Sequence, residues 1–123
     1  MNLTEKHLSV LGQITQKGWG VSSMPNSVTC SLGDGIITLK YMTIVHFAAE
    51  RALRDQVARI NQESIQVLTK CAEDMKSTFK EETGDTLRLK ETSNKDSLEM
   101  IVATNNSPRR VAYYRRQVTL RVV

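Results

Sequence analysis

The chain has 123 residues, of which 40% are hydrophobic and 24% are charged, a balance typical of one globular domain. Its apolar runs are only a few residues long, which excludes the ~20-residue apolar stretch of a membrane span. The first residues, MNLTEKHL, lack the basic and apolar regions of a secretory signal, so we expect an intracellular (cytoplasmic) protein.

The net charge of +4 is unevenly distributed along the chain. Residues 1–104 carry 12 Lys/Arg and 13 Asp/Glu, whereas residues 105–123 carry five arginines and no acidic residue. The basic surplus is therefore confined to the last segment, which indicates a local feature suited to a partner rather than a generally basic protein.

The N-terminal residues predict a helix over 2–17. Asn2 can cap it, since Glu5 follows three residues later and apolar residues then recur at helical spacing. Trp19 lies between two glycines that interrupt the pattern, and it either covers the core at the end of this helix or anchors a partner at the surface. Residues 21–26 are predicted to form a loop or a short edge strand.

A β-hairpin is predicted over residues 27–43. Apolar and polar side chains alternate in 27–32 and again in 36–43, which is the period of a strand with one buried face. The intervening Gly-Asp-Gly can take the positive φ angles of a tight turn, and it lacks the spacing and the strand-to-helix context of a phosphate loop.

Residues 46–82 predict one long amphipathic helix. Its apolar positions recur every three or four residues with an eleven-residue period, interrupted only by Ser64. The inner positions are Ala49, Leu53, Val57, Ile60, Ser64, Leu68, Cys71, Met75 and Phe79. Because this period is close to that of a straight helix, we expect a rod rather than a strand of a left-handed coiled coil.

This helix is too long to be covered by a compact domain. At ~1.5 Å per residue it spans roughly 55 Å, whereas a compact chain of this size is about 30–35 Å across. We therefore expect one end to lie on the domain's own sheet and the other to pack on a partner. The residues of this predicted helix interface are Leu53, Val57, Ile60, Leu68, Met75 and Phe79.

Three further strands are predicted at 86–91, 97–103 and 109–122, separated by turn-like polar residues. The last strand does not alternate cleanly at Tyr113 and Tyr114, so we expect a bulge there. The predicted fold class is α+β, a single domain with the order α-β-β-α-β-β-β. We expect an antiparallel sheet of about five strands arranged in meanders, with a short N-terminal helix and one long central helix on one face.

No catalytic or metal-binding pattern emerges from the sequence. The two histidines, His7 and His46, are predicted to be packing residues, the first on the apolar face of the N-terminal helix and the second at the start of the long one. Cys30 and Cys71 lie on apolar stripes, where cysteine behaves as a small hydrophobic residue. The adjacent acidic residues of the long helix do not face each other. We therefore expect no enzymatic activity, small-molecule substrate, cofactor or metal.

The most unusual segment is PRRVAYYRR at 108–116, in which paired arginines flank paired tyrosines. Arginine binds phosphate and tyrosine stacks on unpaired bases, which favours nucleic-acid binding. Tyr and Arg are also typical of protein interfaces, and an edge strand that avoids aggregation through its charge is a third interpretation. The candidate partner-binding residues are Trp19, Arg109, Arg110, Tyr113, Tyr114, Arg115 and Arg116.

The layout of a hairpin, a long helix (AERALRDQVARINQESIQVLTKCAEDMKSTFKEE) and terminal strands resembles the small structural proteins of tailed-bacteriophage virions, such as neck, tail or baseplate components. The resemblance implies partners that are copies of the chain itself or other virion proteins, in a symmetric ring or wedge. The last residues, TLRVV at 119–123, suit pairing with the sheet edge of a neighbour.

Two functional hypotheses follow from these observations. The first is a non-enzymatic structural protein that assembles through protein–protein contacts, as a homo-oligomer or in a multi-protein assembly. The alternative is a small nucleic-acid-binding protein that uses the Arg/Tyr-rich C-terminal strand. Neither hypothesis involves a membrane.

Overall fold

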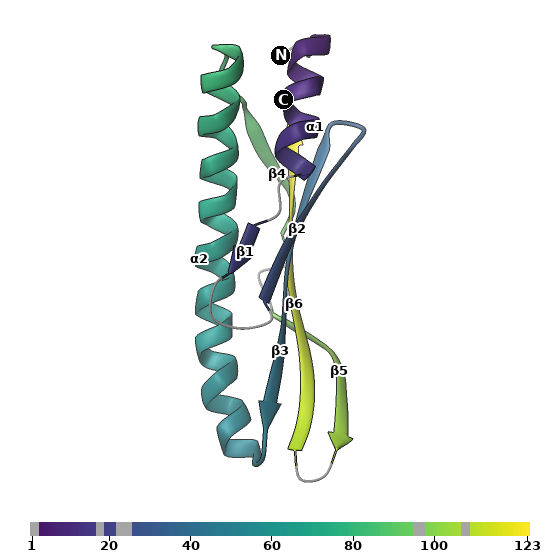
Figure 1. Cartoon of the computed structure of the whole chain (residues 1–123), viewed down its shortest axis with the longest axis vertical. Helices are drawn as coiled ribbons and strands as arrows, with labels where there is room; N and C mark the ends of the chain where they lie inside the picture. Colours follow the sequence, from purple (N-terminus) through teal and green to yellow (C-terminus); the bar gives the residue numbers. More distant parts are fainter. Residues whose placement is uncertain (1–2, 17–18, 22–25, 95–97, 107–108) are drawn as a thin grey trace.

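The computed structural model describes residues 3–16, 19–21, 26–94, 98–106 and 109–123. Within these ranges the chain forms two helices and a six-stranded antiparallel sheet (Figure 1). The elements are α1 (Glu5–Gln16), β1 (Trp19–Val21), β2 (Asn26–Gly33), β3 (Ile36–Phe47), α2 (Glu50–Thr83), β4 (Leu89–Asn94), β5 (Glu99–Asn106) and β6 (Arg109–Val122). The α+β class and the predicted order of elements are confirmed, with the short β1 as an addition.

The sheet has the order β1-β2-β3-β6-β4, and β5 also pairs with β6. β4 pairs with residues 118–122 of β6 and β5 pairs with residues 109–115, so these two strands lie end to end along the same edge of β6. Both run antiparallel to β6 and hence in the same direction. The predicted C-terminal meander is therefore wrong, because β4 and β5 pair with β6 and not with each other. β6 is an interior strand, with β3 on its other side.

The irregularity expected at the paired tyrosines is present, but the additional residue belongs to the neighbouring strand. The register of β5 against β6 shifts between Met100 and Val102, which pair with Tyr114 and Tyr113 respectively. Ile101 is thus the extra residue of a bulge opposite the tyrosines.

Helix α1 is capped by Thr4. The Thr4 hydroxyl oxygen accepts the His7 N–H at 3.3 Å, and the Thr4 N–H donates to His7 Nδ1 at 3.1 Å. This is the reciprocal arrangement of a capping box, with His7 in the place of the usual glutamate. Asn2, the predicted cap, lies outside the described residues.

Helix α2 begins at Glu50, four residues later than predicted, because β3 continues to Phe47. Buried and more exposed side chains alternate as far as Phe47. This period of two is that of a strand with one buried face, so the apolar side chains are buried only if the segment continues as a strand. His46 therefore lies in a strand, and the prediction that it begins the long helix is wrong. The helix ends at Thr83, one residue after the predicted end at 82, and Gly84 takes the left-handed conformation with a φ of 77°.

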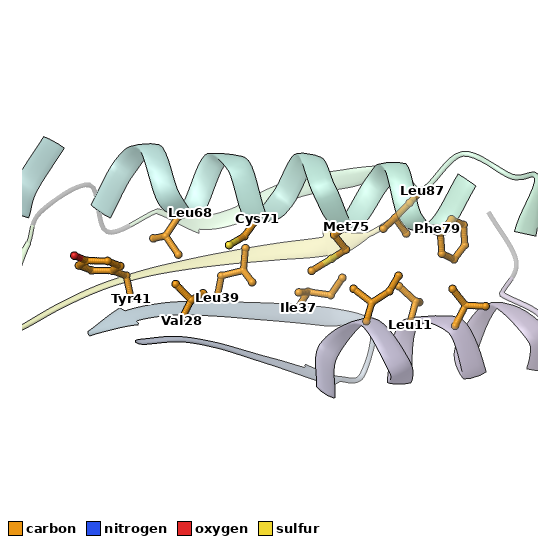
Figure 2. Packing of buried hydrophobic residues seen from close by; sticks show 12 residues of the cluster. Leu11, Val28, Ile37, Leu39, Tyr41, Leu68, Cys71, Met75, Phe79 and Leu87 are labelled. Carbon is orange, nitrogen blue, oxygen red and sulfur yellow. The ribbon is translucent and has the colours of Figure 1, made fainter. Parts of the chain in front are cut away.

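The apolar core is divided into two clusters. The larger cluster lies between α1, α2 and the β2–β3 hairpin, and Figure 2 shows its α2 side chains directed toward the strands. Its buried members are Val10, Leu11, Ile14, Val28, Ile37, Leu39, Tyr41, Leu68, Cys71, Met75, Phe79 and Leu87. The smaller cluster comprises Val45, Phe47, Ala112 and Tyr114, and the first half of α2 packs on it.

Buried polar residues separate the two clusters. Along β3, Thr43 lies between Tyr41 of the larger cluster and Val45 of the smaller one. Ser64 has the corresponding position on α2 and Arg116 on β6, and both are at most 3% exposed. The core is therefore built as an apolar cluster, a polar layer and a second apolar cluster along the length of α2.

Both halves of α2 are covered by the chain itself. The predicted apolar stripe faces inward, since Ser64 and four stripe residues after it are buried and Leu53, Val57 and Ile60 pack on the smaller cluster. Figure 1 shows α2 running beside the elongated β3–β6 ladder and, at its other end, beside α1. The prediction that one end extends past its own sheet to meet a partner is wrong, because the molecule is elongated rather than spherical.

Candidate interaction surfaces

The Arg/Tyr segment does not form one surface. It lies in β6, whose alternate side chains point to opposite faces of the sheet. Arg110, Tyr114 and Arg116 lie on the helix-covered face, because their ladder partners are the buried Phe47, Thr43 and Tyr41. Odd-numbered residues from Arg109 onward lie on the other face. Because β6 is an interior strand, the interpretation as an edge strand is wrong. The four arginines and two tyrosines of the segment are divided between the two faces, so they do not form a single patch.

Arg116 is a core residue. It is 3% exposed, its Nε donates to Ser64 Oγ at 2.8 Å, and its terminal Nη2 donates to Asn61 Oδ1. Ser64, the polar interruption of the α2 stripe, is thus the partner of a buried guanidinium. The same layer contains Asn26, which accepts a hydrogen bond from the Thr43 hydroxyl. A polar residue within an otherwise apolar helical stripe is the sequence signal for such a layer, but it does not identify the partner.

Two other arginines of the segment are held in ion pairs. Arg110 Nη1 lies 2.7 Å from Glu50 Oε1, and Arg115 Nη2 lies 3.1 Å from Glu99 Oε2. Tyr114 is buried, and its hydroxyl donates to the sulfur of Met100 at 3.8 Å. Burial raises the pKa of Tyr114, and the nearby Glu50 adds to the effect.

The sheet face away from the two helices, hereafter the open face, is basic. Ladder register places five basic side chains of β3, β4 and β6 on it, together with one acidic side chain among the described strand residues. The basic residues are Lys40, Lys90, Arg109, Arg115 and Arg121, and the acidic one is Glu99. By contrast, α2 carries six basic and seven acidic residues between its first and last positions.

An apolar strip crosses the middle of the open face. Tyr113 of β6 lies between Ile44 of β3 and Val102 of β5 in the ladder, and all three side chains are on this face. Tyr113 and Ile44 are partly buried, while Val102 is 46% exposed. The open face thus combines a central aromatic ring with cationic side chains above and below it.

Strand β5 forms an edge with unusual composition. It pairs with β6 on one side, and no described strand pairs with its other side. Met100, Ile101 and Val102 are 56%, 44% and 46% exposed, and no charged residue occurs between positions 100 and 106. Natural sheet edges of this length are usually protected by charge or proline. In the described part of this edge, the protective features are the Ile101 bulge and the charged Glu99 at the start of the strand.

The remaining predicted interface residues do not contribute to a surface that can be described. Leu68, Met75 and Phe79 are at most 3% exposed and pack in the protein's own core, so the predicted helix interface is corrected to an internal one. Trp19 pairs with Val28 at the β1 edge, but its side chain lies outside the described residues.

The histidine and cysteine side chains that could take part in catalysis have structural surroundings instead. His7 is buried against Phe79, and because its Nδ1 accepts the Thr4 N–H, its Nε2 carries the proton that is donated to Asp85 Oδ2 at 2.6 Å. Cys71 is buried and its pKa is raised by that burial. Among the described residues, no three His, Cys, Asp or Glu side chains are grouped for a metal ion.

A cleft of about 370 Å³ lies between α2 and the sheet on the β4 side. Leu39, Leu68 and Leu120 form part of its apolar lining, and Glu73 and Glu91 contribute polar groups. Among the described residues, no histidine, cysteine or serine lines this cleft, so they do not bring together a nucleophile and an imidazole base there.

No protein-family model, curated protein or solved structure matches this chain. Neither described helix combines the length with the apolar character that a membrane span requires.

Proposed function

We propose that the protein is a non-enzymatic assembly protein that acts through protein–protein contacts. The observation that carries the proposal is the β5 edge, which presents three adjacent exposed apolar residues on a side that pairs with no described strand. A strand of a partner that adds to this edge satisfies the backbone N–H and C=O groups and covers the apolar side chains.

Assembly at β5 replaces the two assembly features that the sequence favoured. The inner stripe of α2 is used by the protein's own core, and residues 119–121 of β6 already pair with β3 and β4. The β5 edge differs from both because it is accessible without unfolding. A virion component that joins copies of itself or other structural proteins remains the biological setting that we propose, and it rests on the layout of the elements alone.

The test of assembly is the mass of the purified protein in solution. We expect wild-type protein to sediment as an oligomer, or to capture a defined protein from its native extract. Ile101→Lys should abolish that association, because a lysine on a strand edge opposes further pairing. Circular dichroism should show that the fold is retained.

Ile65→Lys is the matched control. Ile65 is 48% exposed, close to the 44% of Ile101, but it lies on α2 rather than on the sheet edge. We expect it to leave the association unchanged. A wild-type monomer that captures nothing, or an equal loss of association in both variants, contradicts the proposed role of β5.

A further inference from the structure

We propose that the open face of the sheet binds single-stranded nucleic acid, with phosphates held by its lysines and arginines and a base stacked on Tyr113. This site shares Val102 with the β5 edge, but its basic residues and Tyr113 lie on β3, β4 and β6, so the proposal does not depend on assembly at β5. It also differs from the segment that the sequence singled out, because of the arginines and tyrosines of that segment only Arg109, Tyr113 and Arg115 lie on this face.

The first support is the separation of charge between the two faces. Five basic side chains and one acidic side chain of the described strands lie on the open face, whereas the helix that covers the other face is nearly neutral. Arg109, Lys90 and Arg121 are exposed. A surface of one dominant sign attracts a partner of the opposite sign over distances of about a Debye length.

The second support is the linear arrangement of these charges. Arg109, Arg115 and Arg121 lie on one side of β6 and are six residues apart. At ~3.3 Å per residue this row is about 40 Å long. Lys40 of β3 and Lys90 of β4 flank it, next to Gln117 and Arg121 respectively. An extended chain of phosphates matches such a row better than a compact anion does.

The third support is the aromatic side chain within the row. Tyr113 lies between Arg109 and Arg115, and it is supported on both sides by Ile44 and Val102. A partly exposed tyrosine among apolar neighbours can stack on an unpaired base, and stacking of this kind tolerates any base. A membrane surface is favoured by a different feature, an amphipathic helix with projecting apolar residues.

The ligand for the test is a fluorescently labelled, unstructured oligonucleotide, as DNA and as RNA, titrated with the full chain and followed by anisotropy. We expect saturable binding, with a log Kd that rises linearly with the logarithm of the salt concentration. The combined variant Lys90→Ala, Arg109→Ala, Arg121→Ala should weaken binding by at least about tenfold. It should also lower the magnitude of the salt slope by about two, since each lost phosphate contact on a single strand contributes about 0.7.

The matched control removes the same charge from the opposite side of the molecule. Arg51→Ala, Arg54→Ala, Lys70→Ala takes three exposed basic residues from α2 and so gives the same net charge. We expect it to change the Kd by less than about twofold, because it leaves the open face intact. Equal weakening by the two triple variants would show a response to net charge alone and would overturn the proposed site.

Substitution of Tyr113 tests stacking separately from charge. Tyr113→Ala should weaken binding by about tenfold with an unchanged salt slope, and Tyr113→Phe should restore it. Failure of wild-type protein to bind either oligonucleotide at low salt overturns the proposal. So does binding only to phosphatidylserine vesicles, with the same dependence on Lys90, Arg109 and Arg121, which would assign the face to an anionic membrane.

Discussion

The two faces of the sheet use the same residue types in opposite ways. Arg115 and Arg116 are adjacent in β6, yet Arg116 is buried and bonded to Ser64 and Asn61, whereas Arg115 lies on the open face in a partly exposed pair with Glu99. The same alternation separates buried Tyr114 from the more accessible Tyr113. Position within a strand, rather than local composition, therefore decides which arginines are buried in the core and which lie on the open face.

The largest effect on the free energy of unfolding is expected in the apolar core on the helix-covered face. Phe79→Ala removes a side chain that is 0% exposed, so it should lower the free energy of unfolding by about 3–5 kcal/mol. Urea denaturation followed by circular dichroism measures this loss. Leu8→Ala, at a position that is 49% exposed, is the control and should change stability by less than about 0.5 kcal/mol. Similar losses in both variants would contradict the described core.

The adjacent arginines provide the next comparison. Arg116→Ala should cost about 1.5–3 kcal/mol of unfolding free energy, because it removes hydrogen bonds from a charged donor and leaves the buried Ser64 hydroxyl without that donor. Arg115→Ala should cost only about 0.2–1 kcal/mol, as expected for a partly exposed ion pair. Chemical denaturation of the two variants under the same conditions measures both values. Equal costs would show that the polar layer does not stabilise the protein.

Alkaline pH should lower the stability of the protein, because two groups on the helix-covered face ionise there. Burial raises the pKa of Cys30 from 9.0 to about 11, with Cys71 adding to the effect. Burial likewise raises the pKa of Tyr41 from 10.0 to about 12, where Glu63 adds to the effect and Thr43 opposes it. Both groups are neutral when protonated, so their contribution is complete below about pH 9 and is lost as the pH rises toward about 12.

The measurement is the urea midpoint at a series of pH values above 8, compared between the wild type and the double variant Cys30→Ala, Tyr41→Phe. The variant lacks both titrating groups, so its midpoint should fall less steeply with pH. An identical pH dependence in the two proteins would assign alkaline unfolding to other groups.

The smallest effect is expected at the end of the sheet where β6 begins. Arg110 and Glu50 form a pair whose side chains are 47% and 66% exposed. Their coupling energy in a double-mutant cycle should be about 0.2–1 kcal/mol and should decrease in high salt. A coupling above this range that persists in high salt would show that the pair is more protected from solvent than its exposure indicates.

The sequence predicts which residues share a face more reliably than which strands are neighbours. Alternation in β3 and in residues 118–122 of β6, together with the stripe of α2, identifies inward residues, because each pattern has the period of its own element. Pairing order has no such local signal. The turn-like residues after β4 therefore suggested a reversal, although β4 and β5 are in line along β6.

The polar layer could be anticipated only in part. Ser64 interrupts the apolar stripe visibly, but Arg116 is 52 residues away in the sequence and belongs to a segment that resembles a ligand-binding motif. Nothing local connects these two residues. Their contact depends on the register of α2 against β6, which follows from the tertiary structure. The prediction that α2 extends past its own sheet is wrong for a similar reason. It compares the length of the helix with the diameter of a spherical domain, whereas this chain folds into an elongated molecule.

The position of β6 has a consequence for the order of events during synthesis. Its three partners β3, β4 and β5 all precede it in the chain, and none of them pairs directly with another of the three. While the chain emerges from the ribosome, the backbone groups of β3, β4 and β5 that pair with β6 remain without these partners until β6 has been synthesised. Completion of the sheet is therefore a late, long-range step, and the nascent chain is most exposed to aggregation and to chaperones just before it.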